Sequence, residues 1–168
     1  MFDFFLRKWI QLIPLSFVKK VSFLRWETPW LKKVLIFLSN RLRFQDAVIV
    51  HGIGQGLKFN AGPSNVGYSL GTSEPHVQRA LKTILRPGMN FYDIGANVGF
   101  FSVLAGQLVQ PTGCVVCFEP LPMNVQWIDY NMKLNGFSNY KIFRLALGAD
   151  NGEASFSLSR ETTWGRLS

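Results

Sequence analysis

Cysteine and histidine are scarce in this 168-residue chain, which holds two of each. Cys114 and Cys117 are three residues apart in an apolar run, and residues so spaced on a strand point to opposite faces. They cannot chelate one metal ion together or close a disulfide easily, and no second cysteine pair or histidine cluster completes a zinc site. We therefore expect two buried free thiols, no metal and a reducing, cytoplasmic location.

Long hydrophobic runs and dense charge are also missing. The longest uncharged apolar run, Val34–Leu38, is far shorter than the roughly 20 residues that span a bilayer. No small-residue cleavage site follows a hydrophobic core, so a secretory signal is not expected. Hydrophobic residues make up 48% of the chain and charged residues 17%, which is typical of a globular protein with a core.

The positive charge is concentrated in residues 1–43. This arm carries nine lysines and arginines against two acids, a net charge of +7 out of the total of +8. Its apolar residues recur at helical spacing, which predicts basic amphipathic helices. Such an arm either lies peripherally on an anionic membrane or caps the core or a partner subunit. Long apolar residues separate the charges, so we do not expect binding to nucleic acid.

In residues 44–86 the apolar residues no longer follow the helical spacing of the arm. Alternation from Asp46 to Gly62 predicts two short strands joined by the glycine loop Gly52–Gly56, and no helix pattern follows that loop as it would follow a phosphate loop. A helix is predicted from Glu74 to Leu85, ended by Pro87-Gly88. The residues expected to face inward are Val77, Ala80, Leu81 and Ile84.

The central stretch is Asn90–Ser102. A short apolar run leads into the glycine turn Gly95–Gly99, and a helix pattern follows with Val98, Phe101, Leu104 and Leu108 on one face. A strand, a turn and a helix in this order direct backbone N–H groups and a helix N-terminus at a small ligand.

Two side chains disfavour a dinucleotide as that ligand, and with it an oxidoreductase. Asn97 stands where the second glycine of a dinucleotide loop would be, and Asp93 places a carboxylate near the phosphates. A ligand with an ammonium group, such as S-adenosylmethionine, fits better. A second buried strand, from Cys114, ends in Glu119, and an acid at that place accepts hydrogen bonds from ribose hydroxyls.

Further elements follow. Pro122–Leu134 predicts a helix with Val125, Ile128 and Met132 inward, ended by Asn135-Gly136. Strands are predicted over Tyr140–Leu147 and Glu153–Ser159.

Several motifs in the same order resemble the FkbM-type methyltransferases. They are Phe91–Gly99, Phe118–Pro122 with Asn124, Asn131 with Asn135-Gly136, Leu145–Gly148 with Asn151–Glu153, and upstream Gly71–Pro75 and Leu85–Gly88. The resemblance implies an α/β, Rossmann-like class I methyltransferase sheet and methyl transfer from S-adenosylmethionine, usually to a hydroxyl. It implies a small-molecule, sugar or lipid acceptor.

On this basis we assign the cofactor contacts. Asp93 binds the ammonium group or its bridging water, Glu119 binds the ribose, and Gly95, Asn97 and Gly99 form the turn. The adenine is flanked by Phe118 and Pro120, with Ala146 near it at the end of the third strand. The base candidates are His51, His76 and Glu74, and the sequence favours none of them, so no catalytic residue is assigned.

The predicted sheet is incomplete. Strands 1–3 are present, which leaves strand 1 as an exposed edge and predicts a fragment or a domain that another chain completes. We divide the chain into the arm (1–43), a lead-in (44–86) and the N-terminal half of a methyltransferase domain (87–168). A non-catalytic cofactor-binding or membrane-surface module is the alternative.

Overall fold

A computed structural model describes residues 44–65, 67–150, 152–153, 156–158 and 165–167, together with scattered positions before residue 44. The predicted amphipathic helices of the arm therefore lie outside the described residues, apart from those scattered positions. In the part of the chain that is described, no helix is long and apolar enough to cross a membrane.

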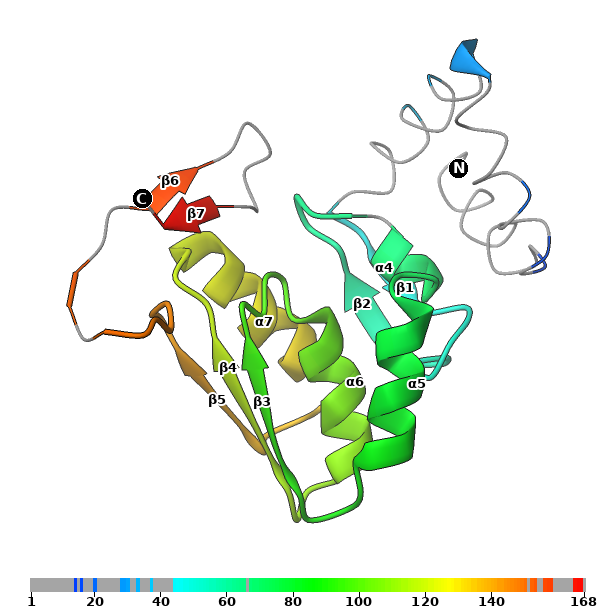
Figure 1. Cartoon of the computed structure of the whole chain (residues 1–168). Coiled ribbons are helices and arrows are strands. Elements are labelled where there is room, and N and C mark those ends of the chain that lie inside the picture. The colour runs from blue at the N-terminus through cyan, green and yellow to red at the C-terminus, as the bar shows by residue number, and fades with distance from the viewer. Residues whose placement is uncertain are drawn as a thin grey trace.

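The centre of the fold is a parallel sheet of three strands (Figure 1). The strands are β3 (Asn90–Ile94), β4 (Cys114–Phe118) and β5 (Tyr140–Phe143), in the order β3-β4-β5. Helix α6 (Phe100–Val109) connects the first two strands and α7 (Pro122–Leu134) connects the next two. The predicted α/β fold is confirmed, and within the described sheet β3 is an edge strand, as expected.

Both connecting helices cover the same face of the sheet, and the core lies between them and the strands (Figure 1). Val115 and Cys117 of β4 are fully buried there. Val103 and Leu104 of α6 and Ile128 of α7 pack against them. Each fully buried aliphatic side chain of this kind stabilises the fold by about 1.5–3 kcal/mol.

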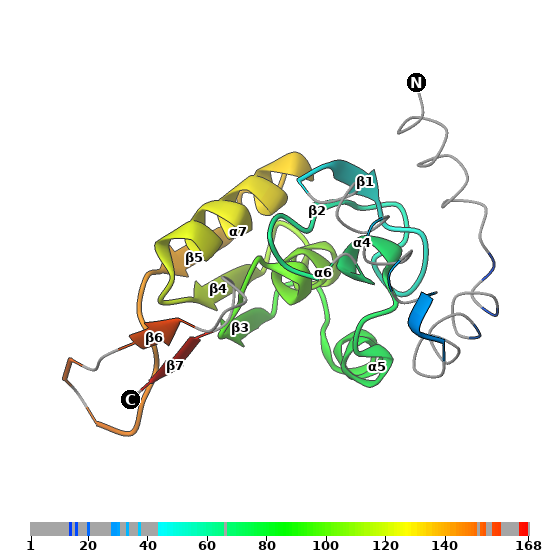
Figure 2. The same ribbon diagram turned by 90° about the horizontal axis from the view of Figure 1, so that it is seen from above.

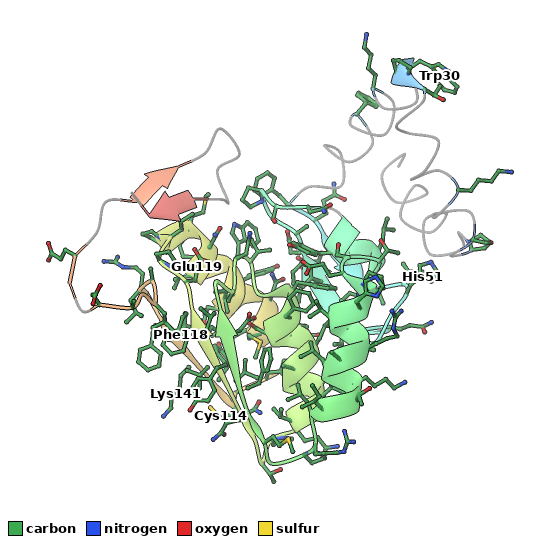
Figure 3. The ribbon with its side chains drawn as sticks, in the orientation of Figure 1. Trp30, His51, Cys114, Phe118, Glu119 and Lys141 are labelled. Carbon is green, nitrogen blue, oxygen red and sulfur yellow. The ribbon has the colours of Figure 1, made fainter. Side chains whose placement is uncertain are left out.

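The opposite face of the sheet is open. Tyr92 is 60% exposed and Ile94 is 64% exposed. The rings of Tyr92, Phe118 and Phe143 form a stacked row across the three strands, with centroid distances of 6.4 and 5.4 Å. Cys114, Phe118 and Lys141 project from the sheet on the side away from the helices (Figure 3). The strand from Cys114 is therefore fully buried on one face only.

A hairpin packs against one end of α7 (Figure 2). Its strands β1 (Asp46–Val48) and β2 (Lys58–Asn60) are antiparallel, which confirms the predicted pair. Two asparagines bind the free edge of β2: Asn131, which lies in α7, and Asn135, which is the C-cap of that helix. Asn131 accepts from the Asn60 N–H at 2.8 Å and donates to its carbonyl at 3.0 Å, and Asn135 does the same for Lys58 at 2.8 and 2.7 Å.

The buried face of α5 (Pro75–Ile84) is not the predicted one. Of the four residues expected to face inward only Leu81 is buried, and Ile84 is 63% exposed. Gln78 is buried instead, because its side chain satisfies two neighbouring loops. It accepts from the Ile53 N–H at 3.1 Å and donates to the carbonyls of Gly71 and Ser73 at 2.9 and 2.6 Å.

Other boundaries and faces also differ from the predictions. Helix α6 is enclosed by the sheet, α5 and α7, so its buried residues extend well beyond the predicted stripe, and Phe101 and Leu108 are only half-buried. Strand β5 ends at Phe143 rather than at residue 147. A short helix, α4 (Gly67–Leu70), and strand β7 (Gly165–Leu167), which pairs with β6 (Phe156–Leu158), were not predicted.

Candidate functional site

The glycine turn Gly95–Gly99 follows the end of β3 and has three residues with positive φ. Asn97 has a φ of 50°, a left-handed conformation that asparagine tolerates better than most residues. Gly99 has a φ of 83°, and a Cβ there would lie 3.2 Å from Cα of Ile128, so this glycine lets α7 approach. A Cβ on Gly95 would meet nothing within 4 Å, which leaves open space over the start of the turn.

The first three amides of the turn are used inside the protein. Gly95 and Ala96 donate to the Phe118 carbonyl at 2.9 and 3.1 Å, and Asn97 donates to Oε2 of Glu119 at 2.9 Å. The expectation that these backbone N–H groups point at a ligand is therefore wrong. They tie the turn to the end of β4.

Glu119 lies where the ends of β3 and β4 meet the start of α7. Its side chain is buried, and Oε1 accepts from the Leu121 N–H at 3.0 Å and the Asn124 amide at 3.2 Å. An ionised carboxylate offers about four acceptor positions. The three bonds from Asn97, Leu121 and Asn124 hold the carboxylate in place and leave acceptor capacity at Oε2 for a hydroxyl.

Asp93 is the second buried carboxylate, at 8% exposure. Its Oδ2 accepts from the Ser102 hydroxyl at 2.5 Å. Burial raises the pKa of Asp93, the bonds from the Ser102 side chain and backbone oppose that rise, and the charge of Glu119 adds to it. The structure thus brings the two predicted acids, which are 26 residues apart in sequence, close enough for their charges to interact.

Tyr68 is a member of this region that the sequence analysis missed. Its ring stacks on that of Phe100, the first residue of α6, with centroids 4.8 Å apart and planes 18° apart. Burial raises the pKa of Tyr68, and the charges of Glu74 and Asp93 raise it further. The phenol therefore stays protonated at neutral pH. No periodicity marks the segment around Tyr68, so only the folded chain reveals this placement.

The base candidates are not brought together. His76 is exposed and its Nδ1 lies 2.6 Å from the Arg79 guanidinium. Glu74 is exposed at the start of α5, with a φ of 45°. His51 is half-buried and lies on the α4–α5 side of the molecule (Figure 3). Nothing in this arrangement selects a catalytic base.

The predicted adenine contacts are dispersed. Phe118 belongs to the aromatic row on the open face, whereas Glu119 is bonded toward the turn and α7. Pro120 is half-buried directly after Glu119, and Ala146 is exposed, three residues beyond the end of β5. The adenine roles of these residues remain predictions.

The thiols point to opposite faces, as expected. Cys117 is buried under the sheet, and Cys114 is half-buried on the open face. Burial raises the pKa of Cys117 to about 12, so this thiol keeps its proton. Among the described residues, no group of three histidine, cysteine, aspartate or glutamate side chains could hold a metal ion.

These features define a parallel α/β unit with two buried carboxylates beside a glycine turn, and part of the chain is similar in sequence to known methyltransferases. No family model matches the chain. It is 28% identical to the protein-L-isoaspartate O-methyltransferase of Methanopyrus kandleri over 80 residues, 46% of this chain and 35% of that one. It is 31% identical to the enzyme of that name from Triticum aestivum over 68 residues, 38% of this chain and 30% of that one. The chain thus spans about a third of these relatives.

Similar solved structures include two with bound ligands. TYW2 of P. horikoshii in complex with MeSAdo has a TM-score of 0.41 and 14% identity, over 54% of this chain and 33% of that one. A putative protein-L-isoaspartate O-methyltransferase of Plasmodium falciparum with S-adenosyl-L-homocysteine has a TM-score of 0.33 and 17% identity, over 59% and 44%. Trm5b of Pyrococcus abyssi has a TM-score of 0.38 and 20% identity, over 56% and 26%.

The names of the sequence relatives agree with the predicted methyltransferase class. They do not show the FkbM-type family. The predicted acceptors are wrong in the light of these proteins. A small molecule, sugar or lipid with no nucleic acid was expected, but the curated relatives are named for protein L-isoaspartate. The resemblance to one family had suggested an acceptor class that the wider set of relatives does not share.

Proposed function

We propose that this chain is the cofactor-binding part of an S-adenosylmethionine-dependent O-methyltransferase. One observation carries the proposal. Glu119 is buried at the end of β4 and is held by Asn97 of the turn and Asn124 of α7, with an oxygen still able to accept. An acid at this place in a parallel α/β unit binds ribose hydroxyls.

The residues present fit the cofactor. Asp93 supplies a negative charge for the ammonium group, and the backbone is open to a ligand at Gly95, where a Cβ would meet nothing within 4 Å. When bound, S-adenosylmethionine supplies a methyl group on a positively charged sulfur. The protein's part is to hold the cofactor at both ends, and such positioning lowers the barrier of a two-reactant step by up to about 7–11 kcal/mol in favourable cases.

An oxygen on a protein is the acceptor that we propose for the whole enzyme. The support is the name of the curated relatives, which are O-methyltransferases of protein L-isoaspartate. No side chain of the described residues is assigned to activate that oxygen. Transfer of a radioactive methyl group to an isoaspartyl peptide, compared with the same peptide carrying aspartate, tests this part of the proposal.

Calorimetry tests cofactor binding directly. We expect the chain to bind S-adenosylmethionine and S-adenosyl-L-homocysteine more tightly than NAD. Glu119→Ala should weaken binding by about 1–3 kcal/mol, because the ribose hydroxyls lose a buried acceptor. Asp150→Ala, which removes an exposed acid, is the matched control and should bind as the original chain does.

Two results would contradict the proposal. Tighter binding of NAD would point to an oxidoreductase, and unchanged affinity in a folded Glu119→Ala variant would remove the ribose assignment. Binding without methyl transfer to any acceptor would favour the alternative of a non-catalytic cofactor-binding module.

A further inference from the structure

Ser102 is a small polar residue in the middle of the apolar core. It is fully buried in α6, facing β3 and β4. Its hydroxyl donates to Oδ2 of Asp93 at 2.5 Å and lies 3.2 Å from Sγ of Cys117. A serine inside a helix costs some stability unless its hydroxyl has partners, and this one links the helix to both strands.

The direction of these bonds follows from the protons. Burial raises the pKa of Cys117 to about 12, so the thiol is a donor at neutral pH. The Ser102 proton goes to the carboxylate, which leaves the serine oxygen to accept from the thiol. The result is a chain of two hydrogen bonds, in which Cys117 donates to Ser102 and Ser102 donates to Asp93.

We propose that Ser102 is a positioning residue that holds Asp93 ionised and correctly turned for the ammonium group of S-adenosylmethionine. This inference rests on the function proposed above. The Ser102 hydroxyl occupies Oδ2, which restricts the orientation of the carboxylate, and we assign the ammonium group to Oδ1. A charge-assisted bond of this kind is about twice as strong as a neutral one.

The other groups around Asp93 make this bond necessary. Glu119, at the end of β4, adds a negative charge that favours the protonated form of Asp93. Cys117 from β4 and Tyr68 from α4 stay neutral, because burial raises the pKa of each. The hydroxyl and backbone N–H of Ser102 are the groups that lower the pKa of Asp93. Without the hydroxyl, Asp93 takes up a proton at higher pH and no longer attracts a cation.

The first experiment measures the Asp93 carboxyl itself. In the full chain, the carbon resonance of Asp93, assigned with Asp93→Asn, is followed against pH by nuclear magnetic resonance. Ser102→Ala should raise its midpoint by about one pH unit, from the loss of one bond to a charged group. Ser102→Thr keeps the hydroxyl and should restore the original midpoint. Cys114→Ala, on the other face of the sheet, is the control and should leave it unchanged.

The second experiment measures the affinity for S-adenosylmethionine against pH. Affinity should rise as Asp93 loses its proton, and in Ser102→Ala the whole rise should move to higher pH by the same amount. Between the two midpoints, the variant should bind up to roughly tenfold more weakly. A purely structural serine would lower affinity equally at every pH, and that outcome would overturn the inference.

The readouts separate the inference from the proposed function. If the chain binds no S-adenosylmethionine at any pH, the function fails, and the resonance titration alone decides whether Ser102 sets the pKa of Asp93. An unchanged Asp93 midpoint in Ser102→Ala overturns the inference whatever binds. If Ser102→Ala does not fold, Ser102→Cys keeps the volume with a weaker donor and should raise the midpoint in the same direction.

Discussion

The two faces of the three-stranded sheet differ in both packing and chemistry. On the face covered by α6 and α7, Val115 and Cys117 are fully buried and Asp93 is nearly so. On the open face, Tyr92 and Phe143 are exposed, and no helix of the described residues covers them. Neighbouring side chains of one strand therefore differ in burial, because strand side chains alternate between the two faces of the sheet.

This difference explains why the buried carboxylate of the candidate site lies on the covered face. The carboxylate of Asp93 lies on the covered face, where burial raises its pKa and the bond to Ser102 opposes that rise. The open face holds the aromatic row and no carboxylate of the three strands. Parallel sheets are usually covered on both faces, so the open face is the unusual one.

The largest effect on stability should come from comparing an isoleucine in the core under the covered face with an isoleucine on the open face. Ile128→Ala removes a fully buried side chain and leaves a cavity, so the free energy of unfolding should fall by about 2–5 kcal/mol. Ile94→Ala removes a side chain that is mostly in water and should cost far less. Urea denaturation of both variants measures the difference, and equal losses would show that the open face is covered in solution.

An intermediate effect should come from the polar contacts beside the covered face. Asn131→Ala strands the Asn60 N–H and carbonyl and the Val98 carbonyl, all bonded to the Asn131 amide. Leaving buried groups unpaired should lower the free energy of unfolding by about 1–3 kcal/mol. Gln126→Ala, at an exposed position of the same helix, is the control. A loss no greater than in the control would mean that water replaces the asparagine.

The smallest effect concerns pH. Because the pKa of Asp93 is raised in the folded state, the folded protein binds more protons than the unfolded chain above the ordinary carboxyl pKa. Asp93 therefore makes stability fall as pH rises from that ordinary value through the raised one. Asp93→Asn should remove this part of the pH dependence, as denaturation at several pH values would show. A slope that persists in the variant would assign it to another group.

Elements whose ends carry proline, glycine or asparagine signals were predicted well. The bounds of α7 match, because Pro122 starts the helix and Asn135-Gly136 ends it, and β3 leads into the glycine turn as expected. The parallel pairing of β3 and β4, and the meeting of Asp93 with Glu119, follow from the length of one helix and one strand.

Contacts between distant segments could not be predicted. Gln78 is buried because loops 7 and 25 residues away bind it, which no helical period reveals. The turn amides are taken by Glu119, 22 residues from Asn97, so a local motif suggested a ligand contact that the chain itself fills. Ser102 gave a weak signal that we missed, a lone hydroxyl among the apolar residues of α6.

Side chains at the end of α7 occupy the hydrogen-bonding edge of β2 that a further strand would otherwise pair with. Side-chain amides of Asn131 and Asn135 each exchange two bonds with a backbone residue, as a paired strand would. Four helical residues rise about 6 Å, and two strand residues rise about 6.6 Å, so an i, i+4 pair on a helix matches an i, i+2 pair on a strand. The two asparagines therefore act as a ruler for the hairpin. Sliding β2 by one residue would break all four bonds together, so α7 selects the register of a strand formed some 70 residues earlier in the chain.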